Sequence, residues 1–241
     1  HGVIKVYLQS PNIGKREMTW TNCSCRLRPV LTLLFAAGII PLGQSSEFPV
    51  LEGPYLGQQT PGLTAELFAP GFVSVTGRYE FALSFTPAGD RLLFTVQTED
   101  AKVMVLHSRW HDGQWTPPAP VSLAAGARKD EMEAFFSPDG HHVFFAPYDE
   151  GMDVRIWQVS VDGDEWLNPS PLQGNISEDS AFYPTMATDG SLYYSNIKQR
   201  RPYVARQQDD GSWSAEPVAV EFEVHVFIMH VFIAPDQSFM L

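Results

Sequence analysis

Short runs of apolar residues alternate with turn-forming residues along most of the chain. Typical runs are RLLFT at residues 91–95, VFFA at 143–146 and LYYS at 192–195. They are rich in β-branched and aromatic side chains, and 18 Gly and 19 Pro punctuate the sequence around them. Such runs predict short strands bounded by turns, whereas long helices need longer patterns with a different period. The pattern therefore predicts an all-β protein.

One turn-and-strand motif occurs four times. It reads FTPAGDRLLFT at residues 85–95, FSPDGHHVFFA at 136–146, MATDGSLYYS at 186–195 and IAPDQSFML at 233–241. Gly89, Gly140, Gly190 and Gln237 are the equivalent positions, and they are separated by 51, 50 and 47 residues. Self-similarity at a fixed period of this length indicates a repeat architecture.

A second motif keeps the same period. It reads HDGQWTPPAPV at residues 111–121, VDGDEWLNPSPL at 161–172 and DDGSWSAEPV at 209–218. Its Asp-Gly pairs favour hairpin turns, so each period supplies four short strands. Four-stranded units repeated around an axis are the blades of a β-propeller, and solenoid stacking is the alternative. The spacing predicts blades of about fifty residues.

The repeated residues have predicted structural roles. Proline presets φ for a turn, Asp bonds its own backbone, and Gly accepts positive φ. Three tryptophans that follow the Asp-Gly pairs are expected to pack between sheets: Trp115, Trp166 and Trp213. The predicted turn residues are Pro87, Gly89, Pro138, Asp139, Gly140, Asp189, Gly190, Pro235 and Asp236.

These motifs resemble the WD40-like β-propeller repeats of the TolB type, in which an aromatic residue precedes Ser-Pro-Asp-Gly and a short apolar strand. The segment FSPDG at residues 136–140 matches fully, whereas Ala88, Thr188 and Gln237 depart from the pattern. The resemblance covers residues 63–241. It implies a propeller fold, and propellers of this type serve many functions.

The chain divides into three predicted regions. Residues 1–46 contain Arg26 and Arg28 before an apolar run at 30–40 and small residues after it, a pattern typical of a signal peptide. Residues 47–62 form a linker, and residues 63–241 form blades near 76–125, 126–175 and 176–222 with a partial one at 223–241. We expect a periplasmic or secreted protein with an incomplete ring. Residues 63–75 resemble the outer strand of a further blade.

Charge and composition exclude several partners and ligands. The formal net charge of −12 argues against nucleic acid or an anionic membrane, which require clustered Lys and Arg. His141 and His142 are adjacent, so a strand would place them on opposite faces, and His225 and His230 are also badly spaced for one metal. The sequence thus predicts no metal site and no cofactor.

Several carboxylates fall in the predicted connections between blades. Glu80 and Glu131 each lie nine residues before the turn glycine, and Glu133, Glu178 and Asp179 belong to the same connections. Glu80, Glu131 and Glu133 are candidates for acid/base chemistry, and Glu178 and Asp179 are candidates for binding. The alternative is that these carboxylates bond backbone amides, since a repeated position suggests a repeated structural role.

Three functional hypotheses follow. The first is an exported propeller that binds a protein or a carbohydrate without catalysis. The second is a propeller enzyme of the glycoside hydrolase or polysaccharide lyase type, with its carboxylates at the channel mouth. The third is that the chain functions only within a longer parent. No nucleophile elbow, phosphate loop or zinc-protease motif occurs in the sequence.

Overall fold

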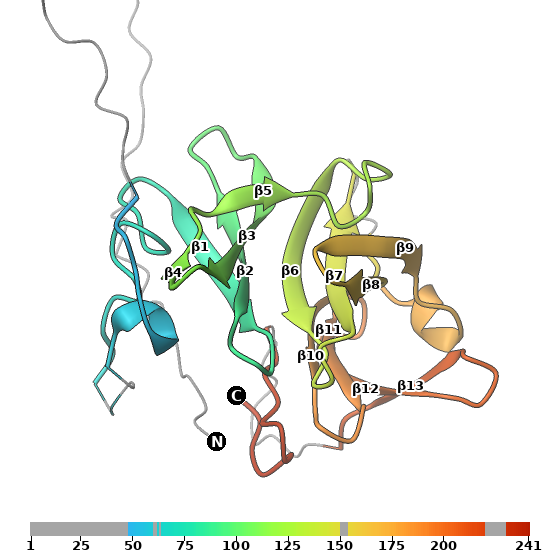
Figure 1. The fold of residues 1–241 in the computed structure, drawn as a ribbon. Helices are drawn as coiled ribbons and strands as arrows, with labels where there is room; N and C mark the ends of the chain where they lie inside the picture. The colour runs from blue at the N-terminus through green and yellow to red at the C-terminus, as the bar shows by residue number, and fades with distance from the viewer. Residues whose placement is uncertain (1–47, 60–61, 63, 150–153, 220–229) are drawn as a thin grey trace, which may run out of the picture. The chain divides into compact units, whose positions relative to one another are not determined.

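Three antiparallel sheets follow one another along the chain (Figure 1). The computed structural model describes residues 48–59, 62, 64–149, 154–219 and 230–241. These residues belong to one compact unit, and the predicted signal peptide, both cysteines and His225 lie outside the described residues. In the described part of the chain there is no helix long and apolar enough to cross a membrane.

In each sheet the first four strands pair with their neighbours in sequence, and the first sheet has a fifth strand outside this order. Two 3-10 helices, η1 (Pro54–Gly57) and η2 (Asn175–Glu178), precede the first and third sheets. The first sheet contains β1 (Tyr79–Phe85), β2 (Arg91–Gln97), β3 (Val103–His111), β4 (Gln114–Trp115) and β5 (Ala119–Val121). Both β4 and β5 pair with β3. The second contains β6 (Asp130–Phe136), β7 (His142–Tyr148), β8 (Trp157–Asp162) and β9 (Glu165–Pro171). The third contains β10 (Ala181–Met186), β11 (Leu192–Asn196), β12 (Arg201–Gln207) and β13 (Trp213–Pro217).

The first motif forms the turn between the first two strands of each sheet. Gly89, Gly140 and Gly190 adopt φ of 71°, 75° and 85°, which only glycine adopts without strain. In the second of these turns Asp139 Oδ1 accepts a hydrogen bond from the His141 amide at 2.9 Å. The fourth repeat forms the same turn with Gln237 at φ 59°.

Every first strand also carries a bulge. The pairing register shifts within β1, β6 and β10, and the residues with left-handed backbone there are Ala82, Glu133 and Tyr183. The fourth repeat has His230 at φ 60° in the equivalent position. A bulge bends its strand and re-aims a side chain, so the repeat places four side chains in equivalent special positions.

Apolar clusters join the sheets. Leu93 and Val105 of the first sheet pack with Val143 and Phe145 of the second. A similar cluster joins the second sheet to the third and includes Trp213, which is 4% exposed. Of the other two predicted core tryptophans, Trp115 is also 4% exposed and Trp166 is partly buried beside Phe136.

The expectation of an outer strand at residues 63–75 was wrong. Residues 69–74 instead form a tight turn, in which the Gly71 amide donates to Ser74 O at 2.8 Å and Gly71 has φ 80°. Pro70 has no backbone N–H to donate in a sheet ladder, and Gly71 favours the turn. The buried Phe72 and Val73 pack on the first sheet with Leu56 and Trp115.

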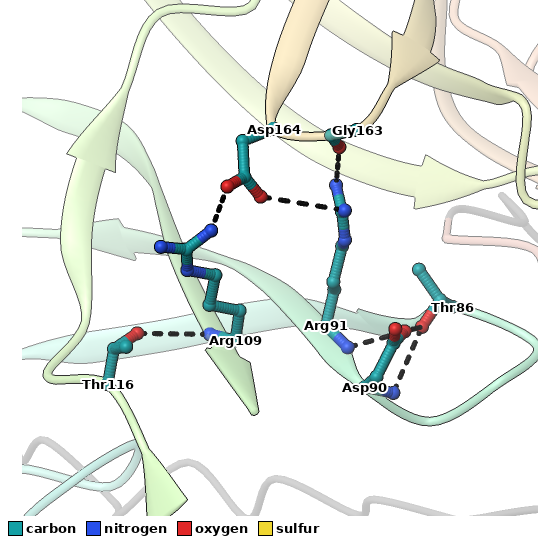
Figure 2. A network of polar contacts seen from close by, with 7 residues as sticks. All are labelled: Thr86, Asp90, Arg91, Arg109, Thr116, Gly163 and Asp164. Atoms are coloured by element: carbon teal, nitrogen blue, oxygen red, sulfur yellow. Dashed lines mark hydrogen bonds and ion pairs between the residues drawn. The ribbon is translucent and has the colours of Figure 1, made fainter. Parts of the chain in front are cut away.

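Polar contacts also join the first and second sheets. Arg91 donates to Gly163 O and lies 3.5 Å from Asp164, and Arg109 bonds the other Asp164 oxygen (Figure 2). Arg91 and Arg109 are direct partners in the register of β2 and β3. Asp164 therefore provides a shared counter-charge for two like charges that face each other across the ladder.

Candidate functional site

The two carboxylates at the repeated position bond backbone amides. Glu131 Oε2 accepts the Leu123 amide at 2.6 Å, and Oε1 accepts the Ala124 amide at 2.9 Å. Glu80 Oε1 accepts the Val75 amide at 3.1 Å and the Arg78 Nε–H at 2.7 Å. Both side chains tie the connection before a sheet to the first strand of that sheet.

The two binding candidates before the third sheet differ from each other. Asp179 Oδ2 accepts a hydrogen bond from the hydroxyl of Tyr194 at 2.6 Å. Burial is the main cause of a raised pKa of Tyr194, and this hydrogen bond and the Asp179 charge raise it further. Glu178 is exposed, and its carbonyl oxygen accepts Lys198 Nζ at 2.8 Å. The structure does not bring these two carboxylates together with Glu80 or Glu131 through any contact among the described residues.

Glu133 has different surroundings. Its side chain is 3% exposed, and its Oε2 accepts the Tyr183 amide at 2.7 Å. Its own amide donates to Thr95 Oγ1 at 2.7 Å, so the residue joins all three sheets. Its second oxygen, Oε1, lies 3.8 Å from Nε2 of His230, which is too long for a hydrogen bond.

Two aromatic rings contact His230, the residue beside this carboxyl group. The His230 ring lies 4.9 Å from the Tyr183 ring and 5.4 Å from the Phe182 ring, measured between centroids. Phe182 is 4% exposed, whereas the His230 side chain is 51% exposed. We call Glu133, Phe182 and Tyr183 the Glu133 cage, and His230 of the fourth repeat occupies it.

Burial shifts the titration of every ionisable group here. Desolvation raises the pKa of Glu133 to about 8, although the Tyr183 amide opposes the shift. Desolvation also raises the pKa of Tyr183 to about 12, with smaller contributions from Glu133 and Tyr79. Desolvation lowers the pKa of His230. The site therefore favours the uncharged forms of all three groups near neutral pH.

Sequence reasoning found Glu133 and missed its neighbours. Glu133, Tyr183 and His230 each lie seven residues before the turn residue of their repeat, as does Ala82 in the first repeat. Alignment of the repeats at this position would have grouped them. The signal was missed because the residue types differ and the left-handed backbone of a bulge has no sequence motif of its own.

The described residues contain no group of three or more His, Cys, Asp or Glu side chains placed to hold a metal ion. The Asp139 carboxylate lies in a turn, with the backbone amide of His141 as a donor. Asp164 pairs with two arginines, and the Arg109 hydrogen bond is the main cause of its lowered pKa. Asp164 is thus part of the contact between sheets.

Comparison with known proteins gives distant structural similarities. No family model matches the sequence, and no curated protein matches it. The crystal structure of TolB from Acinetobacter baumannii is similar to 67% of this chain, with 15% identity and a TM-score of 0.46. A puromycin hydrolase is similar to 61% of it, with 16% identity and a TM-score of 0.43. A Mycobacterium tuberculosis puromycin-hydrolyzing peptidase is similar to 62% of it, with 13% identity and a TM-score of 0.42.

The chain spans a minor part of each of these proteins. The similar region covers 37% of the TolB chain, 24% of the puromycin hydrolase and 25% of the peptidase.

Proposed function

We propose that the chain is part of an exported β-propeller that binds a protein partner and does not catalyse a reaction. The three sheets, of five, four and four strands, follow the period of the repeat and are the successive blades of this propeller. Export is proposed from the basic residues and apolar run of residues 26–40.

The observation that carries the proposal is the bonding of the carboxylates between sheets. General acid/base catalysis with a carboxylate pair requires two groups that both face the substrate. Glu80 and Glu131 use their oxygens on backbone amides, and Asp179 accepts the Tyr194 hydroxyl. These residues therefore hold the fold together. In this proposal the partner binds to the surface of the sheets that these residues hold in place.

A protein partner fits the charge better than an anionic ligand. The net charge of −12 repels polyanions and attracts a basic surface, which raises the rate of association. A neutral carbohydrate is the alternative partner, and it would use exposed aromatic rings such as Tyr79 and Trp110, which are 53% and 37% exposed.

One observation favours the enzyme as a second candidate function. Glu133 has a pKa raised to about 8 by burial and lies beside Tyr183 and His230. A buried carboxyl group with a pKa near the working pH is suited to act as a general acid. In this second reading Glu133 is the acid of a propeller glycosidase or lyase.

The test uses the protein expressed from the uninterrupted reading frame. We would screen it against a panel of exported proteins and a glycan panel, and analyse every mixture for products by mass spectrometry. We expect saturable binding to a protein with all components unchanged in mass. Cleavage of a glycan that is abolished by Glu133→Gln, with the fold retained, would establish the enzyme instead.

A further inference from the structure

One acceptor at the centre of the Glu133 cage is not used by any hydrogen bond of the described residues. Glu133 Oε2 accepts the Tyr183 amide at 2.7 Å, whereas the nearest ion-pair partner of Oε1 is His230 Nε2 at 3.8 Å. The side chain is 3% exposed, so this carboxyl group has little contact with water. A buried carboxyl oxygen of this kind favours a positively charged donor.

The walls of the cage suit a cation. The faces of aromatic rings carry negative potential, and a cation within about 6 Å of a ring centroid is attracted to it. The His230 imidazole already lies 4.9 Å from Tyr183 and 5.4 Å from Phe182. One imidazole therefore contacts both rings and lies 3.8 Å from the carboxyl oxygen.

The occupant is half exposed and comes from another repeat. The His230 side chain is 51% exposed, and its contacts to the cage are ring contacts and one long ion pair. The residue after it is held by backbone contacts, because Thr185 Oγ1 donates to Val231 O at 3.2 Å and Ser195 Oγ accepts the Val231 amide. The imidazole can therefore rotate away while the fourth repeat stays in place.

We propose that the Glu133 cage binds the ammonium group of a lysine side chain of the protein partner, and that His230 occupies the cage in the free protein. This inference rests on the proposed function, because it names the group by which a partner is recognised. The ammonium pairs with Glu133 Oε1 and lies against the rings of Phe182 and Tyr183. The acidic net charge of the chain attracts such a partner.

The titration of the site gives the proposal a pH signature. Among the described residues, the titratable groups beside Glu133 are His230 and Tyr183, and Tyr79 also acts on Tyr183. Because the pKa of Glu133 is raised to about 8, the bound ammonium displaces a proton from its carboxyl group. Lysine keeps its charge over this range. Affinity should therefore rise as pH increases from about 6 to 9 and then level off.

The experiment is an NMR titration of the full-length protein with Nα-acetyl-lysine amide. The reporter is the Tyr183 amide, because it donates directly to Glu133. Nα-acetyl-norleucine amide is the uncharged control ligand. We expect saturable shifts with the lysine compound alone, and about tenfold tighter binding for His230→Ala, since the occupant is removed.

Two variants separate the cage from the rest of the surface. Glu133→Gln keeps a carbonyl acceptor for the Tyr183 amide and should weaken binding about tenfold or more. Glu165→Gln, at an exposed position in β9, is the matched control and should bind like the wild type. Circular dichroism verifies that each variant is folded, and His230→Ala tests the cage even if Glu133→Gln fails to fold.

The proposal is overturned if the Tyr183 amide does not respond to the lysine compound in either the wild type or His230→Ala. Equal binding by Glu133→Gln and the wild type would overturn it as well. A partner protein that binds both with the same affinity would refute the cage and leave the binding function standing. Absence of any protein partner would refute the proposed function, whatever the amine titration shows.

Discussion

At the scale of single residues, left-handed backbone at one position of the repeat determines which side chains meet at the site. Glu133, Tyr183 and His230 all adopt positive φ at the same position of their repeats. Such a conformation costs about 1 kcal/mol or more for a residue with a side chain, so the surrounding structure must enforce it. This repeated position brings an acid, a phenol and an imidazole together from three separate repeats.

Glu133 should make the protein less stable as pH rises. Its folded pKa of about 8 exceeds the ordinary value of 4.5, so between these values the folded state holds a proton that the unfolded state has lost. Its contribution is therefore present below pH 4.5 and is lost by pH 8, at up to about 1.4 kcal/mol per pH unit. Urea unfolding at pH 5, 6.5 and 8 should show that the free energy of unfolding of Glu133→Gln increases relative to that of the wild type as pH rises. A constant difference across this range would contradict the assignment.

His107 should give the opposite dependence. Burial, together with the charges of Arg91 and Arg109, lowers its pKa to about 4, and its Nε2 atom is buried without a hydrogen-bond partner in the described structure. Stability linked to His107 is full above pH 6.5 and is lost as pH falls toward 4. His107→Phe keeps the ring contact with Trp166 and removes the unpaired nitrogen. Thermal unfolding should show a more stable variant, by about 1 kcal/mol, with a weaker acid transition.

At the scale of elements, polar contacts set how neighbouring sheets meet. Asp164 of the second sheet lies between Arg91 and Arg109 of the first (Figure 2). Asp164→Ala should lower the free energy of unfolding by about 1 kcal/mol, because two guanidinium groups then face each other without a counter-charge. The loss should shrink in 1 M NaCl, where the charges are screened. A loss that is unchanged by salt would show that packing, and not charge, is responsible.

Gly174 controls the contact between the segment before η2 and the third sheet. It has φ 105°, and a Cβ there would collide with the backbone of Trp213. Gly174→Ala should therefore cost more than about 2 kcal/mol. Gly113→Ala is the matched control, since Gly113 also has positive φ of 83° but open space around it. Chemical denaturation of both variants checks this, and equal losses would mean that φ alone sets the cost.

The sequence was most informative about elements whose chemistry is local. The repeated turns and the Asp-Gly hairpins depend on residues close together in the chain, so their spacing predicted four strands per repeat, although the first sheet has a fifth. The turn at residues 69–74 was misread as a strand because Phe72 and Val73 are apolar for packing reasons. Residues of the Glu133 cage were mostly missed, because their contacts join β6, β10 and the fourth repeat, which are far apart in sequence.

At the scale of the whole molecule, an acidic repeat protein contains a buried carboxyl group with a strongly raised pKa. Glu80 and Glu131 stabilise connections through backbone amides, whereas Glu133 accepts one amide from the next sheet and lies buried beside His230. In the proposed complex its buried carboxyl group gives up a proton and pairs with a cation from the partner. Such binding breaks and forms no covalent bond of the partner, so the partner should dissociate from the complex chemically unchanged.

The binding screen identifies the partner. Isothermal titration calorimetry of the full-length protein with this partner then distinguishes reversible binding from turnover. Reversible binding predicts one saturable heat that ends near equimolar partner, and no heat afterwards. The same titration with Glu133→Gln should give weaker binding by about tenfold, with the same stoichiometry. A continuous heat from excess partner or glycan added to catalytic amounts of the protein would show turnover and contradict the account.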